Sequence, residues 1–357
     1  MKKDTTVLVG ISGGVDSATA ACMLVSEGYR VIGLNIRVLD SPESNPTLQP
    51  SPLIVSNREE FRIPVYTLNL SKRFRENVIH YFQEEYLAAR TPNPCIVCNK
   101  KIKWAGLLEA ANMLQADFVA TGHYASTSFS DGRFHLHKGA DTKKDQSYFL
   151  WMLQQEELSK TILPLGPLTK PEVRELARVY GVPAAEKKES QEICFVPGDD
   201  YCHYLEQAIP DLADRVQGGE LVDASGTVIG HHRGYPFYTI GQRRGLGAAT
   251  GEPIYVTSID PVHNRIHTGK KTNLLSRELT ARAMNWIGIE PPTEPFEATA
   301  RIRYRDTPTP CRVTPLEDGS ATISFRSPKS AITAGQAAVI YRSDEVLGGG
   351  FITKTTH

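Results

Sequence analysis

The stretch that most constrains the fold lies near the amino terminus, where an apolar run passes through the string SGGVDS, residues 12–17, into a helical pattern. Residues 7–9 form a short run of β-branched and apolar residues, which is typical of a buried strand. In residues 18–25, alanine, leucine and valine recur at helical spacing. The two glycines of the turn permit backbone angles closed to other residues, and the unpaired amides that begin the helix favour an anion. The string therefore predicts a phosphate cradle. The alternative is a tight turn capped by its aspartate or serine.

The pattern of elements changes once along the chain. Up to about residue 207, apolar strands alternate with helical stretches, which predicts a Rossmann-like α/β domain with a parallel sheet. Beyond about Gly218, short β segments bounded by Gly, Pro, Asn and Asp replace the helical pattern. We therefore expect an α/β domain (1–207), a small central β domain (208–275) and a C-terminal β-barrel domain (276–357). The expected break between the last two lies near NLLSRELTARAMNW.

Composition narrows the class of protein. The 357 residues suffice for two or three domains. We find neither a signal peptide nor an apolar run long enough for a membrane helix, so we expect a cytoplasmic protein with mostly reduced cysteines and no membrane partner. The formal net charge is zero, but basic residues are clustered, as in KKIK (100–103) and RIRYR (301–305). Each cluster is either a solvated face or part of a phosphate track for a nucleic acid.

A second chemical motif is TPNPCIVCNKKIKW, residues 91–104, with a CxxC pair at Cys95 and Cys98. Cys98 is expected to begin a lysine-bearing helix, where the helix N-terminus and nearby cations would lower its pKa and favour a thiolate. Metal ligation and thiol chemistry are both open for this pair. A structural zinc site would need a second CxxC or HxxxH, and the chain has only the isolated Cys194 and the adjacent Cys202 and His203.

The other cysteines have simpler interpretations. Cys22 and Cys202 fall in helical patterns and Cys311 in an expected strand, so all three are expected to be small core residues. Cys194 stands in KKESQEICFVPGDDY, where Lys187 and Lys188 would help to hold a thiolate or an anion. Alone, Cys194 would be read as a buried thiol.

The turn SGGVDS resembles the signature loop of the ATP pyrophosphatases, which cleave ATP between its α and β phosphates. Further strings extend the resemblance along the whole chain: TPNPCIVCN, ATGHYA, KKDQSYFL, PLGPLTKPEVRELA, SQEICF and YTIGQRRGLG. In this order they are similar to the bacterial tRNA-specific 2-thiouridylases, the MnmA or TrmU family. That family uses ATP to adenylate the C2 oxygen of wobble uridine 34 in tRNAs for Lys, Glu and Gln, and then replaces the oxygen with sulfur.

The resemblance implies roles for particular residues. It implies ATP and Mg²⁺ as cofactors, with ATP contacts at Gly10, Ile11, Ser12, Gly13, Gly14, Val15, Asp16, Ser17, Ile36 and Gly122. It implies tRNA contacts at Asn93, Pro94, Cys95, His123, Lys144, Asp145, Gln146, Arg303, Tyr304 and Gln336. Cys194 would carry the persulfide, and Cys98 would be the nucleophile that helps to release its outer sulfur, leaving a disulfide bond. A cysteine desulfurase or a sulfur-relay protein would supply the sulfur.

Two departures from the family pattern matter. The segment 37–62 is shorter than usual, which affects one wall of the ATP pocket. Cys95 stands where one branch of the family has an aspartate, so Cys95, Cys98 and Cys194 form a set of three thiols. Such a set would also suit a [4Fe–4S] cluster with one open iron. Both the persulfide route and the cluster route are open from the sequence.

Two rival functions keep some of these features. A PP-loop synthetase that forms an amide or amidine would use the same adenylating loop, but clustered thiols have no use in that reaction. A metal-stabilised, non-enzymatic tRNA-binding module would rely on the C-terminal β domains. Release of AMP in the presence of tRNA would separate this module from either enzyme.

Overall fold

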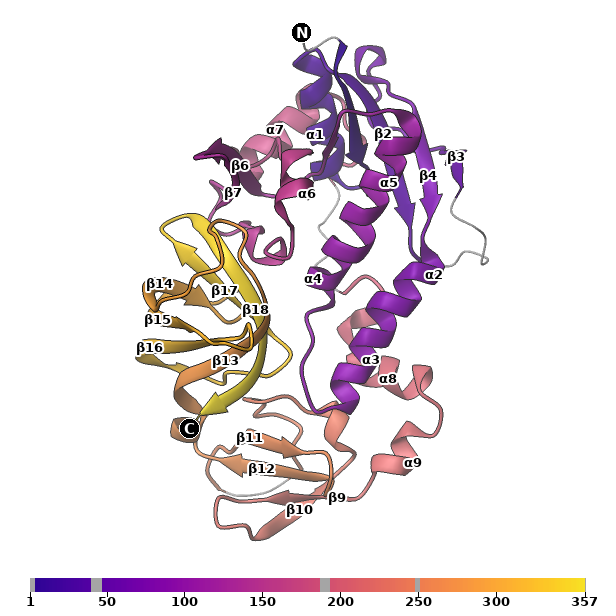
Figure 1. Cartoon of the computed structure of the whole chain (residues 1–357). Helices are drawn as coiled ribbons and strands as arrows, with labels where there is room; N and C mark the ends of the chain where they lie inside the picture. Colours follow the sequence, from indigo (N-terminus) through magenta and orange to yellow (C-terminus); the bar gives the residue numbers. More distant parts are fainter. Residues whose placement is uncertain (1–3, 40–46, 187–192, 248–250, 357) are drawn as a thin grey trace.

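The computed structural model describes residues 4–39, 47–186, 193–247 and 251–356. The chain forms an α/β unit at one end of the molecule, a small four-stranded sheet at the other end and a β-barrel beside them (Figure 1). The fold class expected from the sequence is therefore confirmed. Among the described residues, no helix is long and apolar enough to cross a bilayer.

The α/β unit is built on a six-stranded sheet with the order β3-β4-β2-β1-β5-β8. Its strands are β1 (Thr6–Gly10), β2 (Arg30–Arg37), β3 (Leu48–Pro50), β4 (Val65–Asn69), β5 (Phe118–Ala120) and β8 (Thr161–Ile162). All neighbours pair in parallel except β3, which runs antiparallel to β4. The chain moves outward from β1 to β2 and β4, then returns to the other side of β1 as β5. Open sheets bind ligands where the strand order reverses in this way, which here is the carboxyl end of β1.

Both faces of this sheet are covered by helices. Val7 and Val9 of β1 join a core with α1 (Val15–Ser26) and α7 (Lys170–Val179), whereas Leu8 joins a second core with α5 (Ala105–Leu114). Successive side chains of a strand point to opposite faces, so a strand buried on both sides must be apolar throughout. This is why residues 7–9 form a continuous apolar run.

The two longer helical stretches are each interrupted by a π-helical turn. The first consists of α2 (Ser71–Phe74), the π turn η3 (Arg75–Ile79) and α3 (His80–Leu87), and the second of α4 (Pro94–Cys98), the π turn η4 (Asn99–Trp104) and α5. The expectation that Cys98 begins a helix is wrong. The helix begins at Pro94, because proline lacks the amide hydrogen that the first helical position leaves unpaired, and Cys98 ends α4.

The central β unit contains β9 (Gly219–Val222), β10 (Val228–His232), β11 (Tyr255–Asp260) and β12 (Arg265–Gly269), in the order β10-β9-β12-β11. Two short helices, α8 (Tyr201–Ala208) and α9 (Leu212–Val216), precede it. Short elements elsewhere are α6 (Gln155–Ser159), η2 (Glu59–Phe61), η5 (Ser147–Phe149), η6 (Pro197–Asp199), η7 (Tyr235–Phe237) and η8 (Lys271–Leu274).

The barrel has six strands: β13 (Leu275–Asn285), β14 (Phe296–Arg301), β15 (Thr309–Pro315), β16 (Ala321–Ser330), β17 (Ala337–Arg342) and β18 (Glu345–Thr356). It closes because β13 pairs with both β16 and β18. The stretch expected to be a break between domains is thus mostly strand β13. A hairpin of the α/β unit, β6 (Ala125–Ser130) and β7 (Arg133–Lys138), extends the barrel sheet through β18. The domain limits 1–207, 208–275 and 276–357 stay predictions.

Candidate active site

The SGGVDS turn connects β1 to α1 and is closed by its own serines. Gly13 has φ +78°, a left-handed conformation that favours glycine, and Gly14 precedes the first helical residue. The Ser17 hydroxyl accepts a hydrogen bond from the Ser12 amide at 3.2 Å and lies 3.2 Å from the Gly14 carbonyl, to which it donates. The start of α1 therefore presents backbone amides toward a closed turn, as an anion cradle requires.

The loop after β5 lies directly against this turn at Gly122. A Cβ atom at Gly122 would lie 2.7 Å from the Ser17 nitrogen and 2.8 Å from the Asp16 carbonyl carbon. A residue with a side chain would push the two segments apart. The close approach explains why glycine stands here in ATGHYA.

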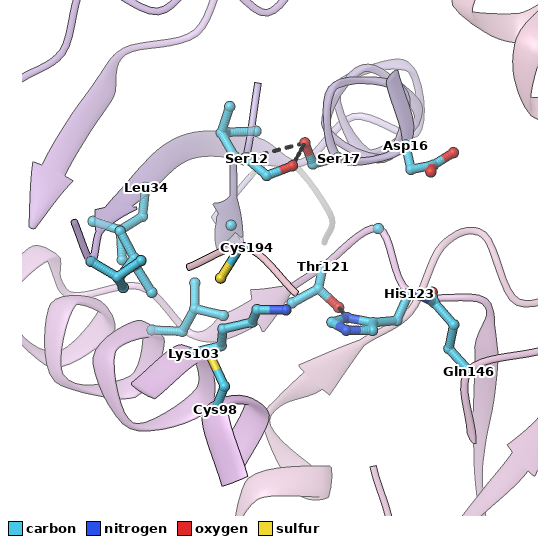
Figure 2. A pocket seen from close by; sticks show the side chains of 16 residues that line it. Ser12, Asp16, Ser17, Leu34, Cys98, Lys103, Thr121, His123, Gln146 and Cys194 are labelled. Carbon is cyan, nitrogen blue, oxygen red and sulfur yellow. Dashed lines mark hydrogen bonds between the residues drawn. The ribbon is translucent and has the colours of Figure 1, made fainter. Parts of the chain in front are cut away.

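A cavity of about 310 Å³ opens at this end of the sheet (Figure 2). Leu34, Ile36 and Val38 of the β2 region and Leu107 of α5 form an apolar wall. Of the residues expected to contact ATP, the lining includes Gly10, Ile11, Ser12, Asp16, Ser17, Ile36 and Gly122, and of those expected to contact tRNA it includes His123 and Gln146. Cys98 and Cys194 line the same cavity. Gly13, Gly14 and Val15 shape the turn without lining the cavity.

Asp16 is held by two side chains that come from elsewhere in the chain. Lys170 Nζ lies 2.7 and 2.8 Å from its two carboxylate oxygens, and the Tyr124 hydroxyl donates to Oδ1 at 2.8 Å. Lys170 is buried at the start of α7. The ion pair therefore fixes the first turn of α1 against α7 beside the phosphate cradle.

The Cys98 thiol is not held as a thiolate. Burial raises its pKa to about 12, and the positive charge of Lys103 opposes this rise only in part. The expectation of a lowered pKa is therefore wrong, because Cys98 lies half-buried at the end of α4 and not at a helix N-terminus. Cys95 and Cys194 are exposed, and both lie close enough to influence the pKa of Cys98.

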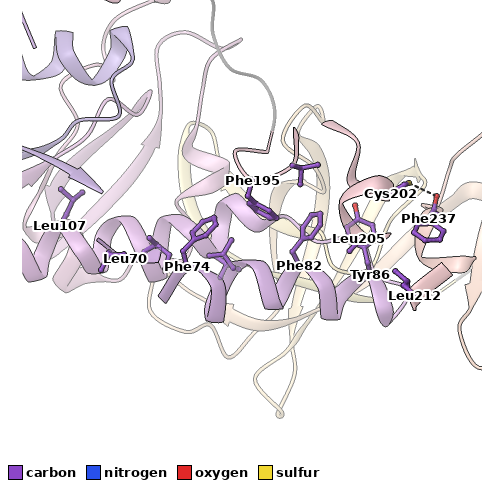
Figure 3. Close-up of a cluster of buried hydrophobic side chains, with 14 of the residues drawn as sticks. Leu70, Phe74, Phe82, Tyr86, Leu107, Phe195, Cys202, Leu205, Leu212 and Phe237 are labelled. Carbon is purple, nitrogen blue, oxygen red and sulfur yellow. Dashed lines mark hydrogen bonds between the residues drawn. The ribbon is translucent and has the colours of Figure 1, made fainter. Parts of the chain in front are cut away.

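Cys194 is positioned by its neighbour in sequence. Phe195 is buried among aromatic rings in edge-on contacts. Its ring centroid lies 5.6 Å from that of Phe74 and 5.1 Å from that of Phe82 (Figure 3). A third edge-on contact, at 5.4 Å, is with Tyr204. This anchor on α2, α3 and α8 holds the short segment that carries Cys194 near the cavity. Lys187 and Lys188, which were expected to support Cys194, lie outside the described residues.

The three cysteines do not form a metal-ligand set. Across the described residues, no group of three or more His, Cys, Asp or Glu side chains is arranged to hold a metal ion. The [4Fe–4S] route therefore stays a prediction, and we derive no step through it. Cys22, Cys202 and Cys311 are buried in α1, α8 and β15, which confirms that they are core residues.

His123 lies at the edge of the cavity between two fixed partners. Its Nδ1 is 2.8 Å from the Thr121 hydroxyl, and its ring centroid is 5.3 Å from that of the buried Trp104. Burial, with a smaller effect from the Lys103 charge, lowers the pKa of His123 well below 6.5. His123 is thus a neutral imidazole at neutral pH.

The barrel holds the loop that leads to Asn93, Pro94 and Cys95. The Gln336 amide donates to the carbonyls of Thr91 at 2.9 Å and Pro92 at 3.2 Å, and the Thr91 amide donates to Ala334 at 2.9 Å. Gly335 has φ +89°, and a Cβ there would lie 2.9 Å from the Thr91 carbonyl oxygen. The CxxC helix therefore starts from a loop that is fixed by a different unit.

The remaining residues expected to contact tRNA are divided between the interior and the surface. The Asp145 carboxylate is buried and pairs with Arg301 at 2.8 Å. It also accepts hydrogen bonds from the backbone amides of Gly139 and Ser147. A direct tRNA contact would require it to leave these partners. Lys144 lies in the turn before it.

Arg303 and Tyr304 lie just after β14. Arg303 is exposed and lines a second cavity of about 390 Å³ together with Arg305 and Lys329. Tyr304 is half-buried, with its ring centroid 4.5 Å from that of Phe149.

Sequence reasoning missed three side chains that organise this site. Lys103 lines the cavity beside both thiols, and Lys170 and Tyr124 hold Asp16. All three lie in strings that were noted for other reasons: KKIK as a charged cluster, and PLGPLTKPEVRELA and ATGHYA as parts of the resemblance. Their roles depend on contacts between residues distant in sequence, which no local pattern reveals.

Comparison with known proteins agrees with this architecture. Three family models match in order: tRNA methyl transferase HUP domain over residues 5–198, tRNA methyl transferase PRC-barrel domain over 204–270 and aminomethyltransferase beta-barrel domain over 276–352. A protein of Chlorobium phaeovibrioides named tRNA-specific 2-thiouridylase MnmA is 87% identical over 356 residues, which cover 100% of both chains. Proteins with the same name from Heliobacterium modesticaldum and Geobacter metallireducens are each 46% identical, and the matches cover 98% and 97% of this chain and 92% and 96% of theirs.

The parallel sheet, the SGGVDS turn and the cavity beside it define an ATP-using enzyme of the PP-loop class with a HUP domain. The methyl transferase in the family-model description differs from the thiouridylase in the relatives' names, and the relatives match over the whole chain. The chain belongs to the tRNA-specific 2-thiouridylase family, MnmA.

Proposed function

We propose that this enzyme converts the C2 carbonyl of wobble uridine 34, in tRNAs of the Lys, Glu and Gln type, to a thiocarbonyl by ATP-dependent adenylation and persulfide transfer. The observation that carries the proposal is that one cavity joins the phosphate cradle, Cys98 and Cys194. An enzyme that activates a carbonyl with ATP and then attacks it with sulfur needs these groups within reach of one substrate atom.

The first half-reaction belongs to the SGGVDS turn. The amides at the start of α1 and the hydroxyls of Ser12 and Ser17 bind the pyrophosphate end of ATP, and the apolar wall at Ile36 takes the adenine. The Asp16 carboxylate would be the oxygen ligand for Mg²⁺ if it exchanged part of its pairing with Lys170 and Tyr124, and the bound ion would neutralise phosphate charge. The uridine C2 oxygen attacks the α phosphate, so that pyrophosphate leaves and AMP remains on C2.

The second half-reaction belongs to the two thiols. The terminal sulfur of the Cys194 persulfide attacks C2, and AMP leaves with the C–O bond electrons. The Cys98 thiolate then attacks the inner sulfur of Cys194 and breaks the bond to the outer sulfur, which remains on C2 as the thiocarbonyl. The Cys98–Cys194 disulfide that results must be reduced by an external dithiol before the next turnover. A cysteine desulfurase or a sulfur-relay protein reloads Cys194.

The tRNA has to present an unstacked base to this cavity. The loop 91–94 and Cys95 meet the target base, with His123, Lys144 and Gln146 nearby, and Arg303, Tyr304 and Gln336 extend the contact onto the barrel side. Asp145 contributes by holding the 144–147 turn through its buried ion pair with Arg301. All these steps suit the cytoplasm, where the thiols stay reduced.

The test is Asp16→Ala, with Glu60→Ala as a surface control in the same unit. Thiolation of the wobble uridine is measured by mass spectrometry, AMP release by chromatography and tRNA affinity by filter binding. We expect Asp16→Ala to lose thiolation and AMP release while tRNA affinity stays near that of the parent. Normal thiolation by Asp16→Ala would overturn the role of the loop, and tRNA binding without AMP release by the parent would favour a binding module.

A further inference from the structure

Lys103 is a cation that the reaction described above does not yet use. Its side chain reaches from the π turn η4 into the cavity, pointing toward Thr121 and Cys194 (Figure 2). Cys98, which lines the same cavity, directly precedes η4. No carboxylate of the described chain pairs with the Lys103 ammonium, whereas its neighbour Lys100 pairs with Glu157 at 2.5 Å.

The π turn explains why Lys103 and Cys98 face the same space. A regular α-helix completes a turn in about 3.6 residues, so side chains five residues apart point in clearly different directions. A π turn bonds residues five apart and therefore brings such a pair back to one face. Single π turns are frequent at functional sites. Here the widened turn brings an ammonium group and a thiol to one cavity.

Among the charged and titratable groups that line the described cavity, Lys103 is the one that brings a positive charge near Cys98. Burial raises the pKa of Cys98 most, the neighbouring Cys194 and Cys95 raise it further, and His123 is neutral because burial lowers its pKa. Asp16 also lines the cavity, on the side opposite Cys98 in Figure 2, and is paired with Lys170. The π turn η3, which packs against α4, carries Arg75 and Glu76, and both are exposed.

Sulfur release requires a negative charge on the Cys98 sulfur. The attacking species is the Cys98 thiolate, so Cys98 must lose its proton to water before it attacks Cys194. Half-burial of Cys98 opposes the negative charge, and a nearby cation offsets part of that cost without supplying or taking a proton.

We propose that Lys103 is a catalytic residue whose ammonium group holds the negative charge on the Cys98 sulfur during sulfur release. This role rests on the proposed persulfide function. It assigns no proton transfer to Lys103: the ammonium stays charged, the Cys98 proton goes to solvent, and the electrons of the broken persulfide bond stay on the outer sulfur.

The role can be tested in the full chain without ATP or tRNA. Alkylation of Cys98 by iodoacetamide is followed by fragment-ion mass spectrometry, which separates Cys98 from Cys95, over a range from about pH 7 to about pH 10. The variants are Lys103→Met and Lys103→Arg. The matched control is Lys101→Met, which removes an exposed lysine of the same π turn that does not line the cavity. Thermal melting checks that each variant is folded.

We expect Lys103→Met to slow Cys98 alkylation about three- to tenfold at each pH, since loss of a nearby cation lowers the thiolate fraction while the more basic thiolate reacts somewhat faster. Lys103→Arg should keep most of the parent rate, and Lys101→Met should match it. Equal rates for Lys103→Met and Lys101→Met would overturn the proposal. So would an increase in KM for ATP with unchanged alkylation, which would assign Lys103 to the nucleotide. Because alkylation needs no substrate, its outcome is independent of whether the thiolation function itself holds.

Discussion

Lys170 and Asp16 are 154 positions apart in sequence, yet the Lys170 ammonium lies 2.7 and 2.8 Å from the two carboxylate oxygens of Asp16. The pair joins α7 to the first turn of α1, and the Tyr124 hydroxyl completes it. Two strings that resemble family motifs, SGGVDS and PLGPLTKPEVRELA, therefore meet in one ion pair beside the phosphate cradle.

Replacing Lys170 by methionine should weaken both the fold and the use of ATP. The Asp16 carboxylate would lose its main partner while remaining two-thirds covered, so the free energy of unfolding should fall by roughly 1–3 kcal/mol. Tyr124→Phe removes one hydrogen bond and should cost less, about 0.5–1.5 kcal/mol. Urea unfolding and KM for ATP measure the two effects, with the exposed Lys160→Met as the control. An unchanged unfolding midpoint for Lys170→Met would mean that the pair contributes nothing.

The contact between Gln336 and the loop before the CxxC helix predicts a second effect. Gln336→Glu keeps the shape of the side chain but cannot donate to the carbonyls of Thr91 and Pro92. The loop should become less ordered, so the rate of thiolation should fall several-fold while KM for ATP stays unchanged. Single-turnover assays at saturating ATP separate these quantities. Equal losses in ATP use and thiolation would place the damage in the α/β unit instead.

The half-buried imidazole of His123 predicts how the free energy of unfolding depends on pH. Because its folded-state pKa lies well below 6.5, the unfolded chain binds more protons between that pKa and about pH 6.5. The free energy of unfolding should therefore rise with pH through this window and level off above it. His123→Phe should flatten the rise, whereas the exposed His80→Gln should not. Urea titrations at a series of pH values give the slopes, and parallel slopes for His123→Phe and the parent would contradict the assignment.

The sequence predicted the fold class and the phosphate turn because both depend on local patterns. Val7–Gly13 contains a strand run and a glycine whose angle follows from the turn itself. The pKa of Cys98 was predicted with the wrong sign, since the true start of α4 at Pro94 and the burial of the thiol are set by tertiary packing. The positions of Lys103, Lys170 and Gln336 depend on a π turn, a distant helix and the barrel, respectively, which periodicity does not encode.

The basic residues near the barrel predict how tRNA affinity depends on salt. If Arg303 contacts a phosphate, the logarithm of affinity should fall steeply with the logarithm of salt concentration, and Arg303→Ala should reduce the slope by about 0.9. Arg326→Ala is a matched control on the same barrel, because the Arg326 guanidinium already pairs with Glu297 at 2.9 Å. Filter-binding titrations at several salt concentrations give both slopes. An affinity that does not change with salt would mean that these arginines are only solvated surface.

Cys95 separates the two routes for sulfur. In the persulfide route Cys95 is a neighbour of the reacting thiols, exposed at the start of α4, so Cys95→Ser and Cys95→Asp should retain substantial thiolation while Cys98→Ser and Cys194→Ser lose it. A cluster held by three cysteines would instead be lost in all three serine variants, together with iron and visible absorbance.

The two routes are distinguished by measuring thiolation, iron content and visible absorbance of protein purified without oxygen. The same measurements after exposure to air provide a second comparison. A disulfide between Cys98 and Cys194 can be reversed by reductant, whereas an exposed cluster decays irreversibly. The persulfide route fails if Cys95→Asp is folded and binds ATP and tRNA but is inactive, and if the parent contains stoichiometric iron and loses activity when the iron is removed. The described residues contain no preformed set of three cysteine ligands. We therefore expect Cys95→Ser to retain thiolation while Cys98→Ser and Cys194→Ser lose it.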